Sequence, residues 1–322
     1  MVTGGGDYCT GESHWVWSFL CGAAEAKALN RTLVVPARRC ISAAHSLTGK
    51  KEEKPMGLYY NMGHMMSRQP MMYETEFKQR FGSMDPEKLQ GTGSTGSTGS
   101  MSVEEFKVWG ATEWVRERTR DVTLVVRRLR EEQFAYQICG VPENKEVLKR
   151  DHSLLWRPPA LSKLSSNISA SMGWDYDAVH VRRGDKVKPS NRRYWPNLDQ
   201  DTQPHALKKT LPKFIQPGRH VYIASNERTP GFFSPLASLY KIHVLSDYRH
   251  LWGPGSQFRR DFRTLLRSLN ETTIKPEMDA YMEWIVEATV IANAKKRVET
   301  FNDLTNDSKN AMIRHNTTEA SS

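Results

Sequence analysis

The chain has 322 residues, of which 38% are hydrophobic and 25% are charged. These are globular proportions, and no stretch approaches the roughly 18 consecutive apolar residues that a membrane-spanning helix needs. The formal charge of +10 favours an anionic partner, such as a nucleic acid, a membrane surface or a phosphorylated small molecule. We expect no nucleic-acid binding, because the sequence has neither a basic stripe interleaved with aromatic residues nor a recognisable reader motif.

In chain order, the first expected elements are a buried helix over residues 13–29 and a short strand over 30–36 that ends at a proline. Residues 91–100 are a Gly/Thr/Ser repeat, which we expect to be a flexible linker of engineered origin. Helix-like charged runs follow around 103–107 and 125–134. Pro158 and Pro159 then break the chain between two expected domains, 1–157 and 158–322.

After the proline break, strands are expected over 178–182, 219–225 and 241–245, with helical patterns between or after them. A long apolar helix is expected over 278–292, followed by a short apolar run at 298–301. Strands that alternate with helices at this spacing predict an α/β fold with a largely parallel sheet.

A cationic cluster follows the first of these strands. Arg182 and Arg183 lie at its carboxyl end, where α/β sheets bind ligands, and strand alternation turns the two side chains to different sides. Gly184 lets the backbone turn close to a bound group. Because guanidinium groups bind phosphate oxygens bidentately, the cluster indicates a phosphate site. The alternative is a salt-bridged strand end at which Asp185 neutralises its neighbours.

The cysteines and the Asn-x-Ser/Thr sequons bear on the compartment. Four cysteines allow three disulfide pairings or none: Cys9, Cys21, Cys40 and Cys139. Chance alone would give about two sequons, so an excess indicates lumenal exposure. The sequence has five: Asn30, Asn167, Asn270, Asn306 and Asn316. Asn30 is expected to be too buried for modification, because it lies between a helix and a strand.

The segment His180 to Val187 (HVRRGDKV) resembles the donor-binding signature of the α1,6-fucosyltransferases and protein O-fucosyltransferases, particularly the plant O-fucosyltransferase-like family. Further matches stand in order along the chain: LNRTLVVP at 29–36, VYIASNE at 221–227 and ETFNDLT at 299–305. The resemblance implies a GT-B-like fold, in which two Rossmann-like domains face each other across a cleft. Residues 1–157 would form the acceptor side and residues 158–322 would bind the donor.

The implied activity is an inverting, metal-independent transfer of fucose from GDP-fucose to a hydroxyl group of a glycan or glycoprotein. The implied location is the Golgi lumen, with a type II membrane anchor that we expect to precede this sequence. Two variants stay open: another GDP- or UDP-linked sugar as donor, and a catalytically silent member that binds glycans.

The resemblance also implies residue roles. Arg182 would hold the β-phosphate and stabilise the charge that develops on departing GDP, with Arg183 assisting. Thr300 and the backbone around Phe301 would donate hydrogen bonds to phosphate, and Glu287 would receive the guanine amino groups. The remaining donor-binding residues are His180, Gly184 and Asn226.

The N-terminal loop departs from the family pattern, because residues 4–12 lack the Gly-Phe-Asn core of animal protein O-fucosyltransferases. Glu12 and His14 are the nearest candidates for a general base that deprotonates the acceptor hydroxyl. The alternative is that Glu12 caps a helix and His14 is a surface or packed residue. Asp199 and Asp201 form an acidic pair that is expected in a solvated loop.

Overall fold

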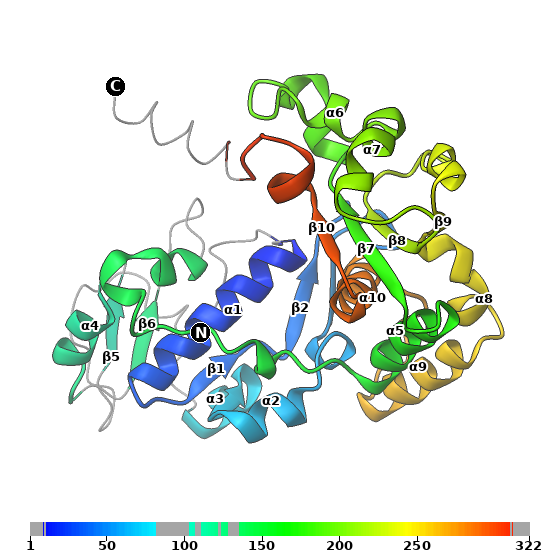
Figure 1. Ribbon diagram of the computed structural model, residues 1–322. Helices are drawn as coiled ribbons and strands as arrows, with labels where there is room; N and C mark the ends of the chain where they lie inside the picture. The colour runs from blue at the N-terminus through cyan, green and yellow to red at the C-terminus, as the bar shows by residue number, and fades with distance from the viewer. Residues whose placement is uncertain are drawn as a thin grey trace. The chain divides into compact units, whose positions relative to one another are not determined.

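The computed structural model describes residues 9, 11–81, 103–106, 111–121, 124–127, 135–309 and 311 (Figure 1). The linker expected at 91–100 and the sequon at Asn316 lie outside the described residues. The chain forms two compact units, which are described separately. Unit 1 comprises Met1–Pro159, Leu265–Ile274 and Met278–Met282, and unit 2 comprises Ala160–Thr264, Lys275–Glu277 and Glu283–Ser322.

Unit 1 combines helices with short two-stranded sheets. Its elements are α1 (Glu12–Ala28), β1 (Leu33–Val35), β2 (Arg38–Ile41), β3 (Glu52–Pro55), α2 (Met62–Arg68), β4 (Met71–Tyr73), α3 (Glu74–Phe81), β5 (Val103–Phe106), α4 (Thr112–Arg118) and β6 (Leu124–Arg127). Strands β1 and β4 pair in parallel, as do β5 and β6, whereas β2 and β3 are antiparallel.

The helix and strand expected at the start of unit 1 are confirmed as α1 and β1. Helix α1 ends in a Schellman turn, in which Asn30 adopts a left-handed φ of 52° and Arg31 N–H donates to Ala26 O over 2.8 Å. Asn30 is exposed there, so the expectation that it is buried was wrong.

The helix-like readings around 103–107 and 125–134 were wrong where the structure describes them, because residues 103–106 and 124–127 form the parallel strands β5 and β6; the rest of the two runs lies outside the described residues. Two valines form the centre of β6, LVVR, and β-branched residues favour extended backbone once a partner strand is available.

Unit 2 is built on one parallel sheet. Its elements are α5 (Pro159–Ser171), β7 (Tyr176–Val181), α6 (Leu198–Asp201), α7 (Pro204–Thr210), β8 (His220–Ser225), β9 (Lys241–His243), α8 (Arg249–Trp252), α9 (Gln257–Ser268), α10 (Ala280–Asn293) and β10 (Arg297–Glu299). The strand order is β10-β7-β8-β9, and every pair is parallel. The expected α/β fold with a parallel sheet is therefore confirmed for this unit.

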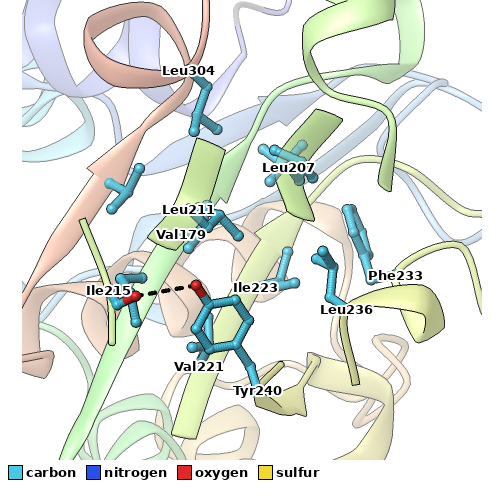
Figure 2. Close-up of a cluster of buried hydrophobic side chains, with 12 residues drawn as sticks. Val179, Leu207, Leu211, Ile215, Val221, Ile223, Phe233, Leu236, Tyr240 and Leu304 are labelled. Carbon is cyan, nitrogen blue, oxygen red and sulfur yellow. Dashed lines mark hydrogen bonds between the residues drawn. The ribbon is translucent and has the colours of Figure 1, made fainter. Parts of the chain in front are cut away.

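Both faces of this sheet are covered, as a parallel sheet requires. On one face, apolar side chains of β7, β8 and β10 pack against α7 and the segment 233–240 (Figure 2). On the other face, the Tyr176 hydroxyl lies 2.8 Å from the Ser169 hydroxyl of α5 and donates to Val290 O of α10 over 2.7 Å. The strand ends are therefore held on a rigid core.

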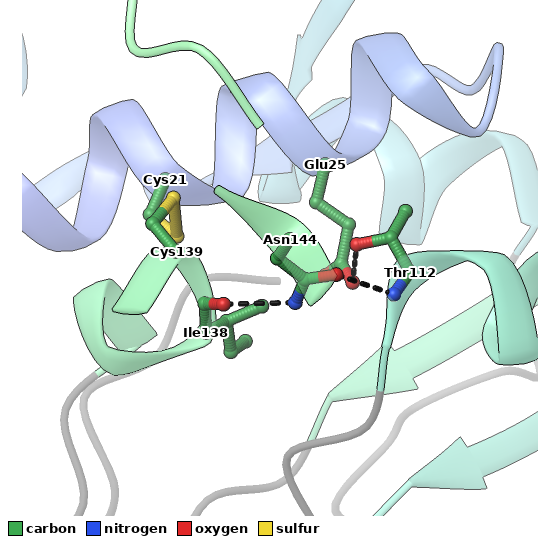
Figure 3. Close-up of a disulfide and its surroundings, with 6 residues drawn as sticks. All are labelled: Cys21, Glu25, Thr112, Ile138, Cys139 and Asn144. Carbon is green, nitrogen blue, oxygen red and sulfur yellow. Dashed lines mark hydrogen bonds between the residues drawn. A yellow bond between two sulfur atoms is a disulfide. The ribbon is translucent and has the colours of Figure 1, made fainter. Parts of the chain in front are cut away.

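All four cysteines are paired, as Cys9–Cys40 and Cys21–Cys139. Figure 3 shows the second disulfide, which joins α1 to the segment 135–140. Buried Asn144 supports this junction, because its Oδ1 accepts from Thr112 N–H and its Nδ2 donates to Ile138 O. Within the described part of the chain, no helix combines the length and apolarity needed to cross a membrane.

Candidate anion-binding site at the strand edge

The site lies in unit 2, where β7, β8 and β10 end at one edge of the sheet. The register pairs Val181 with Ser225 and His180 with Glu299, so the segments that follow the three strands begin side by side. These segments contain most of the residues that the sequence assigned to donor binding: Arg182, Arg183, Gly184, Asn226, Thr300 and Phe301. The tertiary structure therefore brings together three motifs that are far apart in the sequence.

Two side chains fix the backbone at this edge. The buried Thr300 hydroxyl accepts from Arg182 N–H over 2.8 Å and donates to His180 O over 2.5 Å. Asn226 Oδ1 accepts from Arg183 N–H over 2.8 Å. The only hydroxyl proton of Thr300 is thus already used within the protein.

Gly184 adopts a left-handed φ of 56° directly after the two arginines. A Cβ atom at this position would lie 2.1 Å from Asn226 Nδ2, which is closer than van der Waals contact allows. Only glycine fits both the backbone conformation and the space. The sequence had indicated that Gly184 lets the backbone approach a ligand. The structure shows that the tight turn itself requires glycine here.

Arg183 is buried and held by protein groups, with 4% of its surface exposed. Its Nε donates to Glu227 Oε2 over 3.0 Å and its Nη2 to Asp199 Oδ1 over 2.8 Å. Its Nη1 donates to Asp199 O and to the Thr202 hydroxyl, and its Cζ lies 4.6 Å from the centre of the Phe232 ring. Two carboxylates therefore compensate this one cation.

Arg182 has a different environment, as strand alternation predicts for neighbouring residues. Its Nη2 donates to Asp185 Oδ1 over 2.5 Å, and its Nη1 lies 3.4 Å from Arg183 O. The side chains of Arg182 and Asp185 are 26% and 60% exposed. Among the described residues, Asp185 is the carboxylate that pairs with Arg182, and solvent can reach that pair.

Lys186 adds a second cation beside Arg182. Burial, together with the positive charge of Arg182, lowers the pKa of Lys186 to about 8. Its Nζ lies 3.4 Å from the centre of the Trp195 ring and 5.8 Å from that of Phe301. A bound anion would relieve the repulsion between the two cations, so the electrostatics of this edge favour a negatively charged ligand.

His180 lies on β7 itself, and Glu287 lies on α10, within electrostatic range of Arg228, which follows β8. His180 Nδ1 is 3.2 Å from Glu299 Oε2, and this contact holds the pKa of Glu299 below its usual value. Glu287, on α10, retains some solvent exposure, yet desolvation raises the pKa of its carboxyl group to about 8. The charge of Glu283 adds to this shift, and Arg228 opposes it. A carboxyl group that lies below the surface but is still reached by solvent has both properties, so Glu287 is recessed.

The two general-base candidates lie in unit 1. Glu12 is 4% exposed, and its two oxygens accept separately from Arg39 Nη1 and the Tyr60 hydroxyl. It begins α1 without capping it. His14 is exposed on the first turn of the same helix. The structure therefore shows Glu12 in a buried ion pair and not as a helix cap.

The partners of Arg183 could not be read from the sequence. Asp199 had been assigned to a solvated loop, but it lies at the start of helix α6 and binds Arg183 twice, so that assignment was wrong. Glu227 was visible only as part of the VYIASNE match. No local signal marks an acid that pairs with a cation 16 residues away, because the pairing depends on how the chain returns to the sheet edge.

The fold and this edge define an α/β protein with a cationic site where a parallel sheet ends. Residues 1–301 match the family described as a domain of unknown function (DUF7075), and the chain belongs to that family. No curated protein sequence matches the chain.

Among solved structures, the chain is similar to POFUT1 in complex with GDP, with 13% identity, a TM-score of 0.41, and coverage of 91% of this chain and 96% of that chain. It is also similar to POFUT1 in complex with GDP-fucose, with 12% identity, a TM-score of 0.39 and the same coverage.

Proposed function

We propose that this protein is a glycosyltransferase that binds a sugar nucleotide at the edge formed by β7, β8 and β10. The observation that carries the proposal is the solvent-accessible Arg182 guanidinium beside Lys186, on a backbone fixed by Thr300. The motif resemblance then assigns GDP-fucose as the donor and a glycan or glycoprotein hydroxyl as the acceptor. It also assigns a GT-B-like arrangement of the two units.

The chemistry follows from charge and geometry. A donor diphosphate would take the place of Asp185 on Arg182, which can offer two aligned N–H groups to one phosphate. When the bond from the sugar to GDP breaks, negative charge grows on the leaving phosphate. Preorganised cations such as Arg182 and Lys186 can contribute several kcal/mol at that point, so we propose that the transfer needs no metal ion.

Arg183 and Thr300 take positioning roles in this proposal rather than the direct phosphate contacts that the resemblance implied. Arg183 is enclosed by Asp199 and Glu227, and the Thr300 hydroxyl joins β7 to β10. Both keep Arg182 in place. Of the two candidates for the general base, Glu12 is enclosed by its partners, which leaves exposed His14 as the one that an acceptor can reach directly.

We also propose that the protein acts in the secretory pathway, in the Golgi lumen. Two disulfides that use every cysteine favour an oxidising compartment. Exposed sequons such as Asn30 and Asn270 fit the same compartment, because N-glycans are added to surface positions of secreted proteins.

A melting-temperature screen with GDP, UDP, CDP and inorganic pyrophosphate tests the donor assignment. We expect GDP to stabilise the protein most, because ligand at about 100 times its Kd adds about 2.7 kcal/mol. Pyrophosphate should stabilise it weakly through the cations alone. Stabilisation by UDP but not GDP would overturn the guanine assignment, and no stabilisation by any nucleotide or by pyrophosphate would overturn the site.

A further inference from the structure

Arg39 of β2 has hydrogen-bond donors without an acceptor. Its Nη1 donates to Glu12, and three aromatic rings surround its Cζ: Trp15, Tyr59 and Tyr281. Its Nε and Nη2 are buried and have no hydrogen-bond partner in the part of the chain that the structure describes. These two nitrogens lie on one edge of the planar guanidinium group, so Arg39 presents a pair of aligned N–H groups that no described group uses.

Unpaired donors in this position are costly. An N–H group that has lost its water and gained no acceptor carries the full desolvation penalty, which is larger when the group is charged. Aromatic rings stabilise a cation through their faces, but they do not replace hydrogen bonds in the guanidinium plane. Because native proteins rarely leave buried polar groups unpaired, this edge indicates a bound acceptor.

An anion matches this edge better than water does. Among the described residues of unit 1, the buried side-chain atoms without a partner are Arg39 Nε, Arg39 Nη2 and Arg157 Nη1, and all three are donors. A water molecule that accepts from such groups also brings two protons, which need acceptors of their own. An anion only accepts, so it satisfies the donors and adds no new unpaired group.

The position of the edge also favours a negative charge. Glu12, the partner of Arg39, is the first residue of α1, and Trp15 lies on the same helical turn. The guanidinium group therefore lies beside the N-terminus of a 17-residue helix, where the first backbone N–H groups and the helix dipole attract anions.

The charged groups next to Arg39 leave an excess of positive charge. Burial and Glu12 raise the pKa of the Tyr60 hydroxyl, whereas Arg157 and Arg39 lower it, so two cations and one carboxylate act at this point of unit 1. The neighbouring Lys54 is compensated separately by two carboxylates, Asp279 and Glu52. An anion at the Arg39 edge would offset the excess charge around Tyr60.

We propose that the Nε–Nη2 edge of Arg39 binds a small monovalent anion, of the size of chloride or formate, beside the first turn of α1. A multiply charged anion such as sulfate does not fit, because the cost of burying an ion rises steeply with its charge. The bound anion would join β2 to the start of α1, so that the stability of unit 1 depends on it. The site is independent of the proposed donor site, since the two share no residue.

The first test measures the melting temperature of the full chain at constant ionic strength in the sodium salts of gluconate, chloride, bromide and formate. Gluconate is the reference, because it is too large for an enclosed site. We expect a halide or formate to raise the melting temperature by a few degrees, with saturation above its Kd, and the salts that act distinguish a halide site from a carboxylate site. The same melting temperature in all four salts would rule out the site.

The test variant is Arg39→Lys, because lysine keeps a positive charge for Glu12 but loses the Nε–Nη2 edge. We expect the anion-dependent rise to disappear in it. The matched control is Arg38→Lys, which should keep the rise, because Arg38 is the exposed neighbour on β2 and pairs with Glu271. Equal rises in wild type and Arg39→Lys would contradict the proposal, as would a rise that saturating GDP removes, since the anion would then bind at the strand edge.

A second test needs no variant. Anomalous scattering from wild-type crystals soaked in bromide should show a peak within hydrogen-bonding distance of Arg39 Nε and Nη2, and crystals grown with formate should show its carboxylate there if formate is the stabilising ion. A water molecule at this edge under both conditions would refute the anion site.

Discussion

Arg39 in unit 1 and Arg182 in unit 2 each pair with one carboxylate, but they differ in their access to water. Arg39 is 3% exposed, and the Trp15, Tyr59 and Tyr281 rings surround its Cζ at 5.0, 5.4 and 4.4 Å. Its carboxylate partner Glu12 is buried as well. Arg182 and its partner Asp185 both reach solvent.

A second buried pair extends the unit 1 cluster. Lys54 and Asp279 are 5% and 1% exposed, their charged atoms are 2.9 Å apart, and the Tyr59 hydroxyl also donates to Asp279. Charges enclosed in this way stay paired, because separating them inside the protein is costly. A pair that water reaches can exchange partners at little cost, which is what a binding site needs.

The largest expected effect is loss of stability in Arg39→Met. Removing this cation leaves Glu12 buried without its ion-pair partner, and breaking a buried pair in this way typically costs about 3 to 5 kcal/mol. Denaturant unfolding measures the change. The double variant Arg39→Met with Glu12→Gln should recover much of the loss, because it no longer buries a lone charge. A wild-type unfolding midpoint in the single variant would show that this pair contributes little.

Arg182→Lys should instead leave stability nearly unchanged and reduce catalysis. Lysine keeps the charge but loses the planar pair of N–H donors. If that contact strengthens as GDP departs, the variant should lose about 2.7 to 4 kcal/mol of transition-state stabilisation, as when an oxyanion-hole donor is removed. The loss should be seen as a lower kcat. Single-turnover transfer assays measure it, with Arg249→Lys on α8 as the control. Near-normal turnover, or a variant that unfolds, would make Arg182 a structural residue.

Arg183→Lys sharpens the same comparison within unit 2. Lysine cannot reproduce four hydrogen bonds to Asp199, Thr202 and Glu227, so we expect a lower melting temperature, as for a buried pair. The two neighbouring substitutions should therefore have different effects: Arg182→Lys should lower turnover, and Arg183→Lys should lower stability. Identical melting temperatures for both variants would contradict the distinction.

The next effect concerns pH and Glu287. Its pKa is raised to about 8, so the Glu287 carboxyl group of the free protein is protonated at neutral pH. The proton must leave before the carboxylate can accept the guanine N–H groups. GDP affinity should then rise by up to about tenfold per pH unit as the pH approaches that pKa, and level off above it. Without ligand, the same shift makes the free energy of unfolding fall as the pH rises, because the unfolded chain has already released the proton.

Calorimetric titration of GDP across this pH range provides the measurement. Glu287→Gln should remove the part of the pH dependence that belongs to this residue and leave the part that belongs to the phosphate. The same pH profile in wild type and Glu287→Gln would place the guanine elsewhere.

The smallest effect is expected for Asp185→Asn. Asp185 occupies the Arg182 guanidinium when no donor is bound, so removing its charge should strengthen GDP binding. Exposed ion pairs contribute only about 0 to 1 kcal/mol, which limits the gain to a few-fold change in Kd. Weaker GDP binding in this variant would mean that Asp185 helps to hold the ligand.

Much of the secondary structure could be read from the sequence. The apolar runs that became β7 and β8 were placed within a few residues, because strands buried on both faces are nearly continuously apolar. Strands β5 and β6 were misread, because short charged runs carry little periodic signal and parallel pairing is a non-local contact.

The sequence by itself determined that a cationic turn follows a buried strand, since the apolar run before it runs into the HVRRGDKV segment, which holds the end of the strand, both arginines and the glycine. Only the tertiary structure decided which arginine is available to a ligand. Asp199 and Glu227 enclose Arg183, whereas Arg182 has the exposed Asp185 beside it. The physical reason is that desolvation and ion pairing depend on which groups lie within a few ångströms, and distant segments of the chain supply those groups.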